Sequence, residues 1–504
     1  MKKRIIALFL TVSVIIMCFA GCTSDNTENE NITPTEITTV KITDDTNFKL
    51  SYTQSDSLDP FKATTQNNQV LASLVFESLF DLDETYQLLN NIATGYAFTD
   101  SKTIKVDINQ NLTFSDGSKL GIEDVEFSAK AALKSDAYSS ALSGISYFES
   151  NENSLIVHLK YENPYAVNLL TFPICSVNDD ENGYPVGSGR YKYQTASDGK
   201  TVLVANKQNG FDPYITTINL VNIASADSID NAVNIGNISY AFRDMSADTS
   251  KRLSCAKKAI NINNLIYIGI NSSSGITSNA QIRKAISLAV DRSVIAQTAY
   301  FGYANPAEST FNPDFKSIEN INLFLSGADT QTAKQAIVQS GYDSNKLSIS
   351  ILINYNENRQ IAANLIKTQL EAIGFKVKID QQNYKNYMDK IKNGSYDLYI
   401  GEIKLSDDMN LYPFLSPDGQ ASYGINLKSL KCDDYYKEFL SGQAELGKFI
   451  IAFNDETPYI PLVYKKGMIC YSKALKGDMQ GYYTNFFSNI DSWNFNNENT
   501  DNTN

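Results

Sequence analysis

Residues 356–403 alternate between helical and strand patterns, and they constrain the fold more than any other part of the chain. The apolar positions of the two helical segments are Ile361, Leu365, Ile366, Leu370, Tyr384, Tyr387 and Ile391. Each helical segment is followed by a glycine and then by an apolar strand, "FKVKI" (375–379) and "YDLYIGEI" (396–403). Glycine is common where a helix ends in the left-handed conformation. Helix, strand, helix and strand at this spacing predict crossover connections and an α/β layer.

The N-terminal end has the pattern of an exported protein. A basic segment at 2–4 precedes an apolar run at 5–20, which is too short for a comfortable membrane span. Residues 1–21 are therefore predicted to be a signal peptide. The residues Phe-Ala-Gly-Cys at 19–22, where the run ends, resemble the lipobox of bacterial lipoproteins, which implies that Cys22 is lipidated.

The two ends of the mature chain differ from the part between them. Residues 22–47 and 497–504 are polar and poor in large apolar residues, so we expect a flexible tether and a disordered tail. The roughly 450 residues between them are enough for two or three domains. Residues 68–80 and 281–290 carry apolar residues at helical spacing, and residues 154–161 alternate as a half-buried strand.

Charge and cysteine usage restrict the partners. The formal net charge is −13, and loss of the signal peptide makes it more negative by three. Nucleic acid is excluded as a partner, because phosphate binding needs an excess of Lys and Arg. Export permits disulfides, but buried thiols are equally compatible with the sequence, and no CxxC pair indicates a zinc or redox site. The cysteines beyond Cys22 are Cys175, Cys255, Cys432 and Cys470.

Motifs for catalysis and cofactor binding are missing. His158 is the only histidine and lies on the less apolar face of its strand, which predicts neither a triad nor a metal site. Gly-Lys-Thr at 199–201 lacks the upstream glycine of a P-loop, and after Asp198 it fits a hairpin turn better. Gly-Ser-Gly at 187–189 lacks the spacing of a nucleophile elbow. The sequence therefore predicts a protein that is not an enzyme and that uses no cofactor.

Four carboxylates gather in "TFSDGSKLGIEDVEFSAKAAL" (113–133). Asp116 stands in a Ser-Asp-Gly sequence that is typical of turns. Glu123 and Asp124 fall in the first turn of a helix, where carboxylates complement the exposed backbone N–H groups. Glu126 is expected to face solvent or to form a surface ion pair. We interpret this cluster as structural.

Seven motifs occur in one order along the chain. They are "SLDP" (57–60), "VFESL" (75–79), "LTFSDGSKLGIEDVEFS" (112–128), "PVGSGRYKY" (185–193), "NAQIRKAISLAVDRSVI" (279–295), "QLEAIGFKV" (369–377) and "IPLVY" (460–464). Together they resemble the extracellular solute-binding proteins of family 5, which are the oligopeptide-, dipeptide- and nickel-binding components of bacterial ABC importers.

The resemblance implies an α/β fold of the periplasmic-binding-protein type II, with three domains and two lobes that close over a ligand about a hinge. Lobe I is expected at 48–75, 184–262 and 476–496, its extra domain at 76–183, and lobe II at 263–475. The implied function is that of a substrate-binding lipoprotein, which captures short peptides or a similar small solute.

The resemblance also implies partners and a location. The protein is expected to deliver its ligand to a membrane permease whose separate ATPase subunits drive import. We expect a monomer outside the cytoplasm, anchored to the cell membrane through lipidated Cys22. The anchor would lie on the periplasmic side or at a Gram-positive cell surface.

Candidate ligand contacts follow from matching the family's motifs residue by residue. The strand before "SLDP" supplies backbone contacts, "YAFRDM" and "IYIGIN" supply residues near the hinge, and "SDAYSSAL" supplies a tyrosine. The residues are Thr53, Gln54, Ser55, Tyr138, Phe242, Arg243 and Tyr267.

The segment "GEIKLSDDMNLYPFL" (401–415) departs most from the peptide-binding members of the family. Those members carry Gly-Trp followed closely by an Asp that pairs with the peptide's ammonium group. The Trp is missing here. Counted from the C-terminal end of the segment, Asp407 takes the place of that Asp, whereas Leu405 does so when counted from the N-terminal end. Glu402 and Lys404 are additional charged residues, so a zwitterionic or anionic ligand is also compatible with the segment.

Three alternative functions remain open. A nickel-chelate or haem-binding protein of the same fold is disfavoured by the single histidine and the lack of a Met or Cys cluster. A sensory solute receptor has the same sequence pattern as an import protein. A secreted hydrolase is opposed by the missing nucleophile and base.

Overall fold

The structure is a computed structural model that describes residues 47–223, 225–244, 253–318 and 321–495. The predicted signal peptide, Cys22 with residues 22–46 of the tether, and the tail at 497–504 lie outside these ranges. Within the described ranges, no helix combines the length and the apolar character that a membrane span requires.

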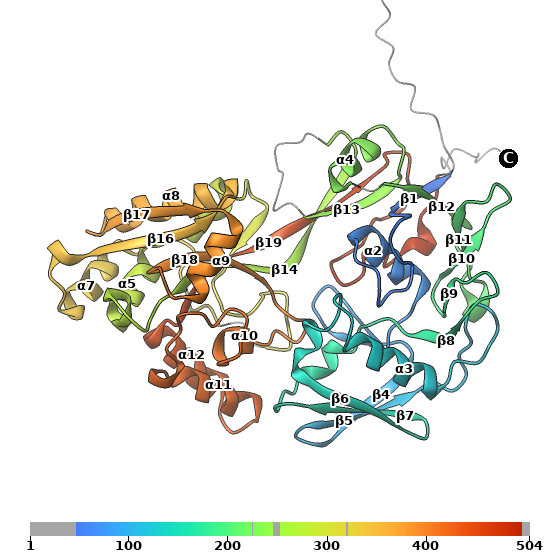
Figure 1. Cartoon of the computed structure of the whole chain (residues 1–504), viewed down its shortest axis with the longest axis horizontal. Coiled ribbons are helices and arrows are strands. Elements are labelled where there is room, and N and C mark those ends of the chain that lie inside the picture. The colour runs from blue at the N-terminus through green and yellow to red at the C-terminus, as the bar shows by residue number, and fades with distance from the viewer. Residues whose placement is uncertain (1–46, 224, 245–252, 319–320, 496–504) are drawn as a thin grey trace, which may run out of the picture. The chain divides into compact units, whose positions relative to one another are not determined.

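The predicted α/β layer is part of the largest sheet. Its elements are β16 (Ser348–Asn354), α8 (Glu357–Glu371), β17 (Lys376–Gln382), α9 (Tyr384–Lys392) and β18 (Leu398–Lys404). β16 lies between β17 and β18 and is parallel to both, and Figure 1 shows α8 and α9 beside these strands. Gly374 and Gly394 have φ angles of 107° and 67°. The prediction for residues 356–403 is confirmed.

Two long strands, β14 (Ala256–Ile270) and β19 (Tyr459–Tyr471), extend this sheet. They pair with each other, and their register shifts between Asn261 and Leu265, next to the lobe boundary expected after residue 262. Beyond the shift, residues 467–471 of β19 also pair with β13 (Tyr240–Asp244), which belongs to the expected lobe I. Residues 467–471, which the resemblance assigns to lobe II, therefore pair with a strand of the expected lobe I.

Lobe I contains a four-stranded sheet in the order β1–β12–β11–β10. β1 is parallel to β12, and the other neighbours are antiparallel. The hairpin predicted at Asp198-Gly199 joins β10 to β11, and Gly199 has the positive φ of 81° that such a turn requires. The core of this lobe includes Phe48, Tyr191 and Trp493. The strands are β1 (Phe48–Tyr52), β10 (Tyr191–Thr195), β11 (Thr201–Ala205) and β12 (Thr217–Asn222).

Helix α2 (Gln66–Val75) ends five residues before the apolar pattern of residues 68–80 predicts. The Val75 carbonyl accepts a hydrogen bond from the Gly189 N–H at 2.9 Å. A Cβ at Gly187 would lie 2.0 Å from the same oxygen, so the close approach requires glycine. The apolar residues that follow the helix instead supply a strand, since Phe80 begins β2 (Phe80–Leu82), which pairs with β3 (Leu88–Asn90).

The expected extra domain contains an antiparallel sheet in the order β4–β5–β7–β6. The strand predicted at 154–161 is β7, and its alternating residues Leu155, Val157 and Leu159 are buried as expected. The elements are β4 (Ala93–Asp100), β5 (Thr103–Ile108), α3 (Ile122–Ala132), β6 (Ile145–Asn151), β7 (Ser154–Leu159) and β8 (Cys175–Asp179). β8 pairs with β9 (Pro185–Gly187), which lies just beyond the expected end of this domain. Helix α3 packs against β6, β7 and β8.

The other elements lie mostly in lobe II and include the helix predicted at 281–290. They are α4 (Ala226–Asn234), α5 (Ala280–Ala289), α6 (Arg292–Thr298), β15 (Ala304–Pro306), α7 (Thr330–Ser340), α10 (Tyr412–Leu415), α11 (Cys432–Leu440) and α12 (Leu446–Glu456). The cysteines at 175, 255, 432 and 470 are free thiols in the structure.

Candidate functional site

The carboxylates near the start of α3 hold local structure. Asp116 accepts hydrogen bonds within its own turn. Asp124 is 8% exposed and accepts backbone hydrogen bonds from Gly121 at 3.0 Å and from Val177 at 3.0 Å. Glu126 forms a surface ion pair of 2.6 Å with a lysine one turn along the helix. These contacts support the structural interpretation of the three residues.

The single histidine lies in a surface contact of the extra domain. The His158 ring stacks on Tyr147 with the ring centroids 4.1 Å apart, and its Nε2 lies 2.9 Å from Glu149 Oε1. Both contacts join β7 to the neighbouring strand β6.

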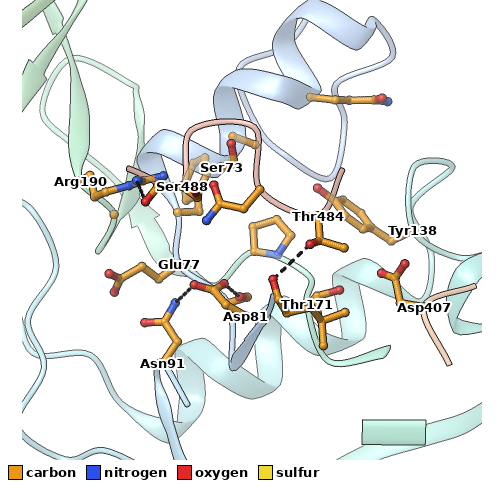
Figure 2. Close-up of a pocket in the computed structure, with 18 residues that line it drawn as sticks. Ser73, Glu77, Asp81, Asn91, Tyr138, Thr171, Arg190, Asp407, Thr484 and Ser488 are labelled. Carbon is orange, nitrogen blue, oxygen red and sulfur yellow. Dashed lines mark hydrogen bonds between the residues drawn. The ribbon is translucent and has the colours of Figure 1, made fainter. Parts of the chain in front are cut away.

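Two cavities share Asp407 as a lining residue. The first has a volume of about 380 Å³ and is lined by the end of α2 and by Tyr138, Arg190 and Thr484, as Figure 2 shows. The second has a volume of about 560 Å³ and is lined mainly by residues between 137 and 144 and between 404 and 420. Cavities of this size hold small ligands in other proteins. The surroundings of Asp407 are therefore the candidate site.

Asp407 presents an unpaired carboxylate to both cavities. It is half-buried, and among the described residues its carboxylate oxygens have no hydrogen-bond or ion-pair partner. Burial raises the pKa of Asp407, and the positive charge of Lys404 opposes this shift. Lys404 is exposed in the second cavity, with its Nζ 4.9 Å from the centroid of the Tyr483 ring. Leu405, the residue given by the other count along this segment, is fully buried.

The next residue, Asp408, is bonded within the protein. It is 2% exposed, and its carboxylate accepts hydrogen bonds from Asn163 Nδ2 at 2.7 Å, from the Asn410 N–H at 3.2 Å and from the Ser406 hydroxyl. Burial raises the pKa of Asp408 to about 6. Asn163 belongs to the expected extra domain and Asp408 to the expected lobe II, and their hydrogen bond holds the loop that carries Asp407.

The sequence matches a family model over most of its length. The model described as bacterial extracellular solute-binding proteins, family 5 Middle, matches residues 87–422. The chain belongs to this family. Family 5 proteins are extracytoplasmic solute-binding components of ABC importers, so this is a binding-protein family rather than a family of enzymes.

Individual family 5 proteins are similar to this chain over nearly its whole length. The glutathione-binding protein GsiB of Escherichia coli K12 is 22% identical over 471 residues, which cover 84% of this chain and 89% of GsiB. The murein tripeptide-binding protein MppA, in its unliganded open form, has a TM-score of 0.70 at 18% identity, over 89% of this chain and 97% of MppA. A nickel ABC transporter protein from Bacillus halodurans has a TM-score of 0.70 at 18% identity, over 86% of this chain and 96% of that one. These matches confirm the α/β fold of the two-lobed type II binding proteins.

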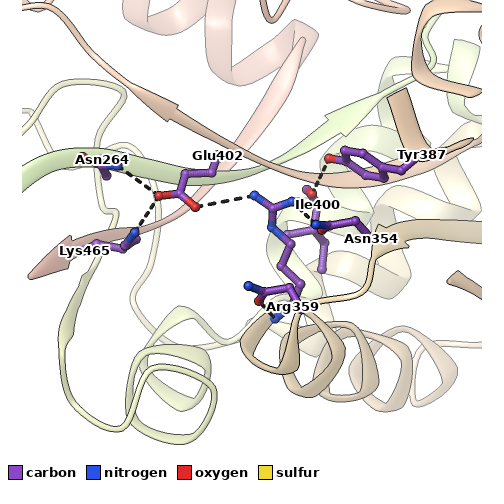
Figure 3. A network of polar contacts seen from close by, with 8 residues as sticks. Asn264, Asn354, Arg359, Tyr387, Ile400, Glu402 and Lys465 are labelled. Atoms are coloured by element: carbon purple, nitrogen blue, oxygen red, sulfur yellow. Dashed lines mark hydrogen bonds and ion pairs between the residues drawn. The ribbon is translucent and has the colours of Figure 1, made fainter. Parts of the chain in front are cut away.

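Glu402, a candidate ligand contact from the segment that departs from the family, is bonded to other protein side chains. Its Oε1 accepts from Lys465 Nζ at 2.6 Å and from Asn264 Nδ2 at 3.0 Å, and its Oε2 lies 3.5 Å from Arg359 Nη2, as Figure 3 shows. Burial alone would raise the pKa of Glu402, but the charge of Lys465 and these hydrogen bonds hold it below its usual value. Glu402 is therefore a charged member of an internal network.

Of the two tyrosines expected at the ligand, only one lines a cavity described here. Tyr138 lines the first cavity, with its ring centroid 6.0 Å from that of Phe61. Tyr267 is 4% exposed in the core of lobe II, where its hydroxyl lies 3.1 Å from that of Tyr399. A Cβ at Gly401 would lie 2.5 Å from the Tyr267 ring, so the ring packs closely against the neighbouring strand, which covers that side of it.

Phe242 and Arg243 lie near the hinge strands and also contact protein groups. Phe242 is 8% exposed and stacks on Phe486 with the ring centroids 4.4 Å apart. Arg243 Nε lies 2.7 Å from Asp230 Oδ1. Neither residue lines the two cavities at Asp407. In the structure Phe242 therefore packs in a core, and Arg243 forms an ion pair within the protein.

The backbone groups expected to pair with a ligand before "SLDP" are already bonded. Asn68 accepts from the Thr53 N–H at 2.8 Å and donates to the Thr53 carbonyl at 3.1 Å. The Gln54 N–H donates to Asn222 Oδ1 at 3.0 Å. Ser55 is exposed, and none of residues 53–55 lines the two cavities. Strand-like pairing with a ligand needs free backbone groups, so Thr53 and Gln54 are poor places for it.

The first cavity contains charged residues that the sequence analysis did not single out. They are Glu77, Asp81 and Arg190. Arg190 stands in "PVGSGRYKY", directly after the glycine that approaches the end of α2. This motif helped to identify the family. That Arg190 lines a cavity becomes visible only in the structure, where the motif contacts the end of α2.

Proposed function

We propose that this family 5 protein captures short peptides for an ABC importer. The observation that carries the proposal is the unpaired carboxylate of Asp407, which faces two cavities of ligand size. A buried charge without a partner is costly, and the ammonium group of a peptide supplies a charge-assisted hydrogen-bonding partner. The similarity to GsiB and MppA, which are named as glutathione- and tripeptide-binding proteins, supports this ligand class.

We further propose that the ligand draws the two lobes together. The first cavity combines Arg190 and Tyr138 of lobe I and its extra domain with Asp407 of lobe II. A ligand that contacts both sides favours the closed state through contacts that the open state lacks. The closed protein would then deliver the peptide to a membrane permease with its own ATPase subunits. The protein would act as a monomer anchored by a lipid on Cys22.

Isothermal titration calorimetry with a short peptide tests the role of Asp407. Asp407→Asn should weaken binding by about 2–5 kcal/mol, or roughly thirtyfold or more, because the ammonium group would be buried without its charged partner. N-acetylation of the same peptide should weaken binding to the wild type by a similar factor.

Asp418→Asn is the matched control, because Asp418 is an exposed carboxylate that lines only the second cavity. It should change affinity less than threefold. If Asp407→Asn and N-acetylation both leave the affinity intact, Asp407 is not the ammonium site. If the wild type binds no peptide, the ligand class is wrong. Native mass spectrometry of protein purified from its host would then identify the ligand that is carried.

Fractionation of cells tests the anchor. Cys22→Ala should move the protein from the membrane fraction to the soluble extracytoplasmic fraction or the medium. Unchanged membrane association of this variant would contradict the lipoprotein assignment.

A further inference from the structure

Arg190 lies directly before β10 and lines the first cavity. Its Nη1 donates to the Phe487 carbonyl at 2.6 Å and to the Ser488 carbonyl at 3.4 Å. Among the described residues, Nε and Nη2 have no hydrogen-bond partner. Arg190 is half-buried, and its Nε and Nη2 donors lack a protein acceptor in the part of the chain that the structure describes. Such a group gains most from a planar anion that accepts two hydrogen bonds at once.

The carboxylates near Arg190 leave it without a contact ion pair. Asp81 uses its oxygens to accept from Ser78 Oγ at 2.8 Å and from Asn91 Nδ2 at 3.4 Å. Burial raises the pKa of Glu77 to about 7, so Glu77 is protonated and uncharged in a large fraction of the molecules at neutral pH. Within the described ranges, no carboxylate lies within ion-pair distance of the Arg190 guanidinium.

Asp407 lines the same cavity, and Figure 2 shows it on the opposite side from Arg190, with Thr484 between them. The cavity therefore contains a guanidinium with free donors and, on its other side, the carboxylate of Asp407 without a partner among the described residues. The two groups come from different lobes. A molecule with a carboxylate at one end and an ammonium at the other complements both charges. A volume of about 380 Å³ is at the small end of the usual range for ligand sites, which favours a short molecule.

We propose that Arg190 is a specificity-determining residue that binds the terminal carboxylate of the ligand, while Asp407 binds the ammonium. The ligands would be short zwitterionic peptides with a free C-terminus. This inference rests on the proposed function and adds to it the requirement for a carboxylate. Since the two anchors belong to different lobes, a ligand that lacks either charge loses one of the contacts that favour closure.

The first test changes the ligand and leaves the protein intact. Calorimetry on the wild-type protein compares trialanine with C-terminally amidated trialanine. Amidation removes the negative charge and should weaken binding at least thirtyfold. N-acetylated trialanine serves as the control for the other end of the ligand and reports on Asp407.

The second test changes the protein. Arg190→Gln should weaken binding of trialanine by a similar factor but should change the binding of the amidated peptide less than threefold. Arg190→Lys keeps the charge and loses the fork of donors, so it should have an intermediate effect. Lys192→Gln is the matched control, because it removes the same charge two residues along β10, outside the cavity. It should leave the affinities for both peptides unchanged.

Arg190 also holds the Phe487 carbonyl, so thermal unfolding of each variant must be measured beside its affinity. Equal losses of affinity for trialanine and its amide in Arg190→Gln would assign Arg190 a purely structural role and overturn the inference. If wild-type protein binds the two peptides equally well, the carboxylate requirement is wrong, although peptide capture stands. If the effect of amidation disappears in Lys404→Gln instead, the carboxylate lies in the second cavity. If no peptide binds the wild type, the proposed function fails and this inference fails with it.

Discussion

Replacement of Asp124 tests whether the carboxylates at the start of α3 are structural. The carboxylate joins two segments, because it accepts from Gly121 before the helix and from Val177 in β8, each at 3.0 Å. Asp124→Ala removes both acceptors and leaves two backbone N–H groups without them. Asp124→Asn retains one amide oxygen and loses the negative charge.

The size of the effect follows from these two hydrogen bonds. A hydrogen bond to a charged group contributes about 1.5–3 kcal/mol. Val177 is 48% exposed, so water can reach this region and replace part of the lost bonding. We therefore expect Asp124→Ala to lower the free energy of unfolding by about 2–3 kcal/mol, and Asp124→Asn by about 1 kcal/mol.

Differential scanning calorimetry of the mature protein measures the effect, with Asp116→Ala as the control. Asp116 is exposed and bonds only within its own turn, so its replacement should lower the free energy of unfolding by about 0.5 kcal/mol. Affinity for the ligand should not change in any of these variants. A large loss of affinity in Asp124→Asn with unchanged stability would refute the structural interpretation.

Two other predictions concern the loop and the strand beside the site. Burial raises the pKa of Asp408 to about 6, so the folded state binds this proton more tightly than the unfolded state does. The bound proton adds about 3 kcal/mol to the free energy of unfolding. This stabilisation is fully present below about pH 4 and is lost as the pH rises through 6. Urea unfolding between pH 4 and 8 should therefore show a flatter profile for Asp408→Asn than for the wild type, and parallel profiles would contradict the prediction. Gly401→Ala places a Cβ 2.5 Å from the Tyr267 ring and should lower the free energy of unfolding by about 1–3 kcal/mol in the same assay. An unchanged free energy of unfolding would show that the ring can move aside.

The sequence by itself determined the local elements of lobe II. Apolar spacing predicted α8, β17, α9 and β18, because each of these elements buries one stripe or face and so imposes its own period on the sequence. The glycines at 374 and 394 marked the helix ends correctly, since few residues other than glycine adopt the positive φ that often follows a helix. The turn and helix start around Asp116 and Asp124 were equally local and equally predictable.

Contacts between distant segments decided where the local patterns stop. The apolar pattern predicted one helix over 68–80, but the chain leaves the helix after Val75, whose carbonyl bonds the Gly189 N–H. The same applies to β19, since its residues 467–471 pair with β13, which lies far away in the sequence. Neither partner segment can be inferred from the residues beside the change.

The candidate site was predictable only in part, for the same physical reason. The sequence analysis named Asp407 and Tyr138, which line the first cavity, but also Glu402 and Tyr267, which lie in an ion-pair network and in a core. The sequence analysis did not single out Arg190, because no pattern in the nearby residues indicates that it lines a cavity. Only the tertiary structure brings it to the cavity that Asp407 also lines. The local order of helices and strands is encoded in nearby residues, whereas a binding site depends on side chains that are brought together from distant positions in the chain.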